Sequence, residues 1–165
     1  MEEGTVQKGK VAMVFNVAND EDSRATLSDD LKVNFVNGDE IAVFDGISTD
    51  PNKFIVQNAT GNSATISGTV SEGAQDFKAV YPFSAAVGIQ EGVLTINIPS
   101  AQVIPAGKNI DPSALVSIAT ASAGTTLLFK NAVSLLKFTL STNDVNFVCI
   151  KSNSGEPLSG NCSIE

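Results

Sequence analysis

The sequence contains no histidine and no tryptophan, and its 165 residues include only one arginine, one tyrosine and two cysteines. Without histidine the chain lacks the most common general base, the most common zinc ligand and every Ser–His or Cys–His catalytic pair. No serine stands in a nucleophile-elbow motif, and no glycine-rich segment carries the lysine of a phosphate-binding loop. We therefore expect no enzyme, no catalytic residue and no cofactor.

Positive charge is also scarce, since the net charge is −8 and the basic residues form no cluster. This balance argues against nucleic acid and against anionic membrane surfaces as partners. No apolar run reaches the length of a membrane span. The opening MEEGTVQKGK has no apolar core of a signal peptide. We expect either a cytosolic protein or one whose export signal is not in this sequence.

The two cysteines, Cys149 and Cys162, flank the turn-forming SNSG at unequal distances. In a hairpin of residues 145–164 they would not face each other, as a disulfide requires. Two small buried thiols are favoured over a bridge. A sugar-stacking surface would depend on Tyr81 or on phenylalanines, because no tryptophan is present.

Alternation of apolar and polar residues with a period of two dominates the sequence. Val11, Met13, Phe15 and Val17 alternate with smaller or more polar residues and predict a strand with one apolar face. Turn residues separate most of the later apolar segments, which are LKVNFV, EIAVFD, FIVQN, SATISGTV, FKAVYPF, VLTINIP, ALVSIATA, TLLFK, VSLLKFTL, NFVCIKS and PLSGNCSI. Many short strands at this spacing predict an all-β sandwich or barrel.

We expect residues 1–142 to form an N-terminal β-sandwich domain. Residues 143–165 would form a closing hairpin or the start of a second β-sandwich domain.

Three carboxylates stand close together in VNFVNGDEIAVFDG, namely Asp39, Glu40 and Asp45. Asn37-Gly38 is a strong hairpin signal, so LKVNFV and EIAVFD are predicted to pair, and Asp45-Gly46 fits the next turn. The stretch lacks the ligand spacing of an EF-hand loop. Turn chemistry is favoured over a calcium site built from several loops, and we expect no metal.

The order of several short motifs resembles that of the fimbrillin-like family. The motifs that carry the resemblance run from about Lys10 onward and are SRATLSDDLKVNFVNGDEIAVFDG, FKAVYPFSA, LTINIPSAQVIPAG followed by ALVSIATA, LLFKNAVSLLKFTL and VNFVCIKSNSGEPLSGNCSI. Phe35 stands where the family commonly has tryptophan, and Asn131 where histidine often follows Phe-Lys. Both positions have structural roles in the family, so these two differences do not affect any expected catalytic or binding chemistry.

The resemblance implies an antiparallel Greek-key β-sandwich of the transthyretin type. It also implies a shaft, anchor or adhesive subunit of surface fimbriae of Gram-negative anaerobes. Such proteins are exported and held at the outer membrane by a lipid anchor, which would lie outside this sequence. In polymerising members a protease cuts after an arginine beyond the first strand, and a strand from a neighbouring subunit fills the groove that opens.

Carried onto this chain, the removable strand would be Val11 to Val17, and the cut would fall between Arg24 and Ala25. Arg24 is the only arginine and stands in the polar stretch NDEDSRATLSDD. The alternative is an ordinary surface arginine that pairs with its acidic neighbours. The alternative function is a cell-surface binding module, for glycans among other ligands, that shares the fold without polymerising. An enzyme fragment with its active site elsewhere fits less well.

Overall fold

The computed structural model describes residues 9–20, 34–104, 106, 110–136, 139, 141, 144 and 147–164. Within this part of the chain the protein is all-β, which confirms the predicted class. The elements, in chain order, are β1 Lys10–Asn19, β2 Glu40–Phe44, β3 Asn52–Gln57, β4 Ser63–Ser71, β5 Asp76–Tyr81, the 3₁₀ helix η3 Phe83–Ala85, β6 Ala86–Gln90, β7 Val93–Ile98, the 3₁₀ helix η4 Pro112–Ala114, β8 Ser117–Ser122, β9 Leu127–Asn131 and β10 Gly160–Ile164.

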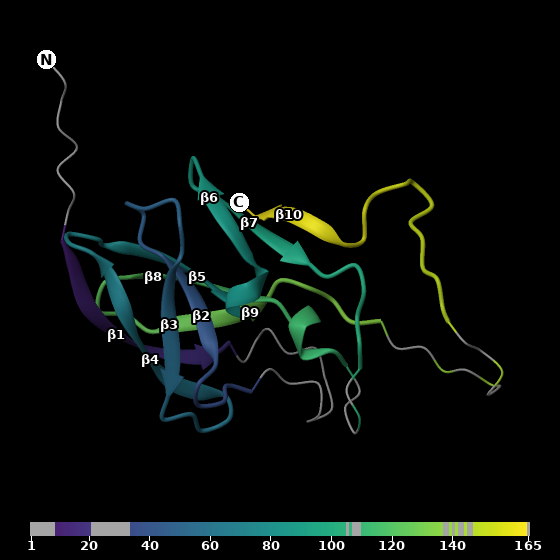
Figure 1. The fold of residues 1–165 in the computed structure, drawn as a ribbon, viewed down its shortest axis with the longest axis horizontal. Coiled ribbons are helices and arrows are strands. Elements are labelled where there is room, and N and C mark those ends of the chain that lie inside the picture. Colours follow the sequence, from purple (N-terminus) through teal and green to yellow (C-terminus); the bar gives the residue numbers. More distant parts are fainter. Residues whose placement is uncertain are drawn as a thin grey trace, which may run out of the picture.

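Seven strands close into a barrel in the order β1-β4-β3-β2-β5-β8-β9 (Figure 1). Six of the neighbouring pairs are antiparallel, and the seventh, β1 with β9, is parallel. The other three strands form a separate antiparallel sheet in the order β10-β7-β6. The barrel and the small sheet together account for every strand of the described chain.

Strand β2 explains how the two sheets are joined, because both of its faces are buried. Ile41 and Val43 face the barrel core, while Ala42 and Phe44 face a second apolar cluster outside the barrel. Leu94 of β7 belongs to the same second cluster. The nearly continuous apolar run of β2 is therefore the pattern expected of a strand covered on both sides.

The second apolar cluster lies between the outer wall of the barrel and the small sheet. The wall contributes Val80 of β5 and Val116, and the small sheet contributes Leu94 and Ile96. Burying these aliphatic side chains removes apolar area from water at roughly 25 cal/mol per Å². The small sheet is thus fixed against β2 and β5, on the outside of the barrel.

The predicted hairpin of LKVNFV with EIAVFD is wrong in the described residues, although its turn is correct. Gly38 adopts a φ of +94°, and the Asp39 amide donates to the Val36 carbonyl at 3.0 Å. Strand β2 pairs with β3 and β5 instead, and Phe35 forms an isolated bridge with Gly61. Both edges of β2 are occupied, which leaves no place for a third partner.

Two further predicted strands, VSLLKFTL and NFVCIKS, are absent from the described parts of 133–140 and 147–152. A hairpin around SNSG, one of the two possibilities for residues 143–165, does not form in the described residues, where β10 pairs with β7. A strand exists only with a neighbour to bond, and alternation in the sequence does not supply one. Strand β6, whose register with β7 shifts between Ala86 and Gly88, was not predicted.

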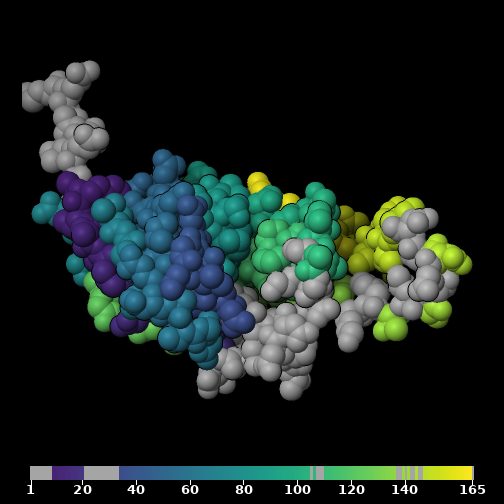
Figure 2. Space-filling model, turned by 60° about the horizontal axis from the view of Figure 1, so that its bottom comes forward, coloured from purple at the N-terminus to yellow at the C-terminus, as the bar shows by residue number. Residues whose placement is uncertain are grey.

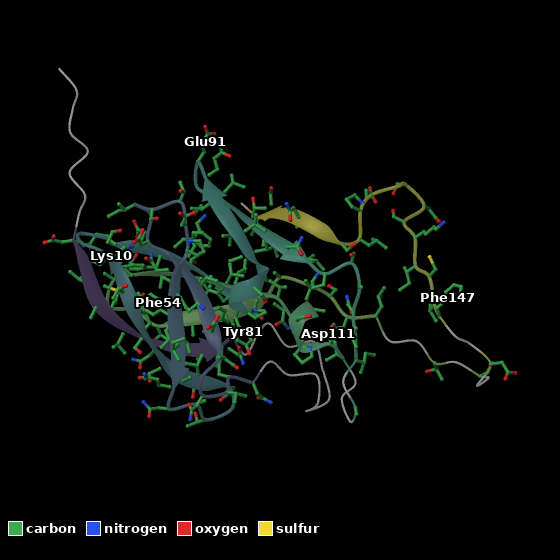
Figure 3. All side chains as sticks on the ribbon, viewed as in Figure 1. Lys10, Phe54, Tyr81, Glu91, Asp111 and Phe147 are labelled. Carbon is green, nitrogen blue, oxygen red and sulfur yellow. The ribbon has the colours of Figure 1, made fainter. Side chains whose placement is uncertain are left out.

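The segment around residues 147–158 extends away from the barrel, at the end of the molecule opposite β1 (Figure 2). It exposes large apolar side chains, and Phe147 is 83% exposed. Figure 3 shows Phe147 on this segment, far from the barrel residue Phe54. No helix in the described residues is long and apolar enough to span a bilayer.

Candidate functional site: β1 and its groove

Strand β1 is paired unequally on its two sides. On one side it pairs with β4 at nine consecutive positions, from Lys10 to Ala18. On the other side it pairs with β9 at three positions, Val17 to Asn19. Among the described residues no strand bonds that side of β1 from Lys10 to Asn16. One complete ladder and one short parallel contact therefore hold the backbone of β1.

The side chains of β1 that fill the barrel are concentrated in its second half. Phe15 and Val17 are buried, and the Phe15 ring lies 4.9 Å from the Phe77 ring and 5.7 Å from the Phe54 ring, centroid to centroid. Met13 is only partly buried against this cluster. The inward apolar face predicted from the sequence is therefore correct at these three positions.

Val11 departs from that expectation, since 39% of it is exposed. Near Val11 the strand has only β4 beside it in the described part of the chain, so no second wall covers its side chain. Two side chains of β1, Phe15 and Val17, are thus buried in the barrel. We call the apolar groove that they fill the seat of β1.

Polar contacts hold both ends of β1. At its start the Glu72 amide donates to the Gly9 carbonyl at 2.8 Å, and the Lys10 ammonium donates to Asn52 Oδ1 at 2.6 Å. At its end the Asp20 amide donates to the Phe129 carbonyl at 2.8 Å. The Lys130 ammonium lies 3.3 Å from a carboxylate oxygen of Asp20. These contacts fix the register of the strand in the groove.

A buried carboxylate, Asp45, organises the end of the barrel at which β1 begins. Its Oδ1 accepts the amides of Ile47 at 3.1 Å and Ser48 at 2.9 Å, and its Oδ2 accepts the Ser71 amide at 2.8 Å and Asn52 Nδ2 at 3.1 Å. The Lys10 ammonium lies 3.9 Å away. We call Asp45 with its four N–H donors the Asp45 cluster. It joins the end of β2, the start of β3 and the end of β4.

Burial alone would raise the pKa of Asp45, because it disfavours the charged form. The hydrogen bonds from Ser48, from the amide and hydroxyl of Ser71 and from the Ile47 amide outweigh burial and hold the pKa well below its usual range. Asp45 is therefore ionised at every physiological pH. The sequence indicated only a turn at Asp45-Gly46, and the carboxylate's role in joining three strands was missed.

The other two carboxylates of the acidic stretch have partners of their own. Asp39 accepts the Val36 amide at 2.9 Å and the Tyr81 hydroxyl at 2.7 Å, and Glu40 pairs with Lys53 at 2.8 Å. The turn interpretation therefore describes Asp39 and Asp45 correctly. Among the described residues no group of three or more acidic, cysteine or histidine side chains is placed to hold a metal ion.

Tyr81 is half-buried and does not form a sugar-stacking surface. Its ring packs edge-on against Phe35, 5.6 Å between centroids, while its hydroxyl donates to Asp39. Burial raises the pKa of Tyr81, and the hydrogen bond to Asp39 and the charge of that carboxylate raise it further. Tyr81 thus has a structural role, because it links Phe35 to the turn at Asn37–Asp39.

Cys149 and Cys162 are both free and exposed, so the expectation of buried thiols is wrong. Cys149 lies on the extended segment, and Cys162 lies on β10, at the edge of the small sheet. The proposed cleavage position, Arg24 and Ala25, lies outside the described residues. The structure therefore describes the strand predicted to be removable and the groove that it fills, but not the proposed point of cleavage.

Comparison with known proteins finds no family model, no curated protein and no solved structure that matches this chain.

Proposed function

We propose that this chain is a structural, anchor or adhesive subunit of cell-surface fimbriae that assembles by strand exchange. A protease would remove β1, and an extended strand from another subunit would fill its groove. The protein would be exported and held at the outer membrane by a lipid anchor outside this sequence. We also propose that the barrel wall and the small sheet correspond to the two layers of a Greek-key, transthyretin-like sandwich.

The observation that carries the proposal is the seat of β1. A strand with a nine-position ladder on one side and a three-position contact on the other can leave by breaking one long ladder and one short contact. Its departure would expose the β4 edge and the apolar surface that Phe15 and Val17 cover. An unpaired edge beside an apolar groove is the arrangement that accepts an added strand.

The groove specifies what the incoming strand must carry. Its β4 edge requires extended backbone over about nine residues, matching the register from Lys10 to Ala18. Its floor requires two apolar side chains two residues apart, one large enough to replace Phe15 between Phe54 and Phe77 and one the size of Val17. Positions corresponding to Val11 and Val14 are exposed and tolerate polar residues.

The Asp45 cluster supports the proposal because it does not depend on β1. Its four N–H donors come from Ile47, Ser48, Asn52 and Ser71, none of which lies on β1. Loss of β1 removes the ammonium of Lys10, which also donates to Asn52 Oδ1, and the strand that pairs with Ser71, but none of these four donors. Strand β4, the longer wall of the groove, would thus stay joined to β2 and β3 while the groove is empty.

A trypsin time course followed by mass spectrometry tests the proposal. We expect early cleavage after Arg24, followed by retention of the β1 fragment. Burial of Phe15 and Val17 with part of Met13 favours retention by roughly 4–7 kcal/mol before the cost of ordering the strand. Arg24→Gln should block both the cut and the later assembly.

Displacement is then measured with a synthetic peptide of residues 10–19 in excess. The wild-type peptide should replace the retained fragment in native mass spectra, and a peptide with Phe15→Asp and Val17→Asp should not. When the β1 fragment is removed and no peptide is added, size-exclusion chromatography should show oligomers of the cleaved protein. If the cleaved protein stays monomeric after loss of β1, or if the two peptides compete equally, the proposal is wrong.

A further inference from the structure

A cleft of about 490 Å³ lies where the tip of the β6–β7 hairpin meets the outer wall of the barrel. Glu91 marks the tip of this hairpin in Figure 3. The cleft is lined by the polar side chains of Asp76 and Lys78 of β5 and of Thr120 and Ser122 of β8, and by the aliphatic side chain of Ile89 of β6. The volume is in the range of small-ligand sites.

The register of β5 with β8 places four polar side chains on one patch of the wall. Asp76 lies opposite Ser122, and Lys78 lies opposite Thr120. Residues two apart on a strand share a face, so the two rows form a square of polar groups. Between the rows Phe77 points into the barrel core, which confirms that the square faces outward. We call these four residues the polar square.

The polar square presents donors and acceptors that are already held in position. The Ser122 hydroxyl donates to Asp76 Oδ1 at 3.1 Å, and the Lys78 ammonium donates to the Gly92 carbonyl at 2.5 Å. The second contact ties the hairpin to the barrel and fixes one wall of the cleft. An ammonium has three donors and a carboxylate has two acceptor oxygens, so both groups have further bonding capacity.

We propose that this cleft binds a single sugar ring of a glycan. One carboxylate beside one ammonium leaves the patch without net charge, which favours a neutral ligand over an anion or a cation. Adjacent ring hydroxyls both donate and accept, and they match the mixture of carboxylate, ammonium and hydroxyl groups in the polar square. Ile89 offers an aliphatic surface for the C–H face of the ring.

The expected affinity is weak for a physical reason. The two phenylalanines of the lining, Phe44 and Phe77, are buried and present no ring face for stacking. Hydrogen bonds exchanged with water contribute modestly, and an open cleft buries only part of the ligand. We expect a dissociation constant on the order of millimolar for a monosaccharide. The inference does not rest on strand exchange, because the cleft lies on β5, β6 and β8 and needs no movement of β1.

The test is a titration of ¹⁵N-labelled protein with methyl α-glycosides of glucose, galactose, mannose and fucose, followed by amide chemical shifts. At least one glycoside should shift amides near residues 76–78, 89–92 and 120–122 in a saturable way. Linear sorbitol, which carries similar hydroxyls without a ring, should not. Because the ligand is neutral, the shifts should not change with added salt.

Thr120→Val and Ser122→Ala remove one hydroxyl each from exposed positions and should weaken binding about three- to tenfold. Thr69→Val is the matched control, since Thr69 is exposed on β4 and away from the cleft. Absence of shifts with all four glycosides overturns the proposal. Equal binding of sorbitol also overturns it, as does glycoside binding that Thr120→Val leaves unchanged. Salt-sensitive binding of acetate that depends on Lys78 would show an anion site instead and would overturn it too.

Discussion

Replacing Asp45 by asparagine tests whether one buried carboxylate holds three strands of the barrel together. The new side chain keeps a carbonyl oxygen that can accept from Ile47 and Ser48. Its NH₂ group then faces two other donors, the Ser71 amide and Asn52 Nδ2. Asn52 gains nothing by turning its amide round, because its Nδ2 also donates to the Val43 carbonyl and its Oδ1 accepts from Lys10.

The magnitude follows from these two lost hydrogen bonds. A hydrogen bond to a charged group contributes about 1.5–3 kcal/mol, and a buried donor left without an acceptor costs about 1–3 kcal/mol. Allowing for partial relaxation, we expect Asp45→Asn to lower the free energy of unfolding by about 2–4 kcal/mol at pH 7. Asp50→Asn is the matched control, because Asp50 is an exposed aspartate five residues away. Its effect should stay within about 0.5 kcal/mol.

Urea unfolding followed by far-ultraviolet circular dichroism suits a protein without tryptophan. Because folding depresses the pKa of Asp45, its contribution is complete above the unfolded-state pKa of about 4 and declines as the pH falls towards the folded value. The stability gap between wild type and Asp45→Asn should therefore be constant above about pH 5 and narrow in stronger acid. A gap below about 0.5 kcal/mol at pH 7, or one that acid leaves unchanged, would refute the reasoning.

Three further measurements test the packing and the exposure of individual groups. Gly68→Ala should destabilise the barrel by about 1–3 kcal/mol, because a Cβ there would lie 2.6 Å from the Phe54 ring, whereas Gly88→Ala meets nothing within 4 Å and should be nearly neutral in the same urea assay. Tyr81, the only tyrosine, should ionise at a higher pH in the native protein than in urea, and coincident titration curves at 295 nm would contradict the buried hydrogen bond. Both thiols should react with a disulfide reagent in the native protein as fast as in urea, and protection of either would contradict their exposure.

Strands that carry their own periodicity and turns could be predicted from the sequence. The stretch Val11 to Val17, the SATISGTV strand and the turn at Asn37-Gly38 each carry their signal in a few consecutive residues. The chemistry of turns likewise explains Asp45-Gly46, where an aspartate accepts amides two and three residues ahead. Such features depend on local geometry, so one sequence is enough to find them.

Features that depend on distant pairing could not be predicted in this way. Nothing near Asp45 indicates that its second oxygen meets the Ser71 amide, 26 positions away. The pairing of β10 with β7, and the square formed by β5 with β8, likewise require the register between strands that are far apart in sequence. The apolar alternation around Leu136 and Phe147 predicted strands, but alternation indicates only that a segment can pair.

The proposal that β1 is the exchangeable strand has a physical basis in the two cores. Strand β2 serves both cores and is bonded on both sides, so its loss would expose the barrel and the small sheet together. Strand β10 lies at the edge of the small sheet, and most of its residues are exposed, so its loss would open no comparable groove. Strand β1 fills only the barrel core and has one complete ladder, and the N–H donors of the Asp45 cluster, which joins its neighbour β4 to β2 and β3, lie outside β1. Of these three strands, β1 is the one whose removal would leave an apolar groove beside a long unpaired edge, that of β4, which stays joined to the rest of the barrel and can bond a replacement.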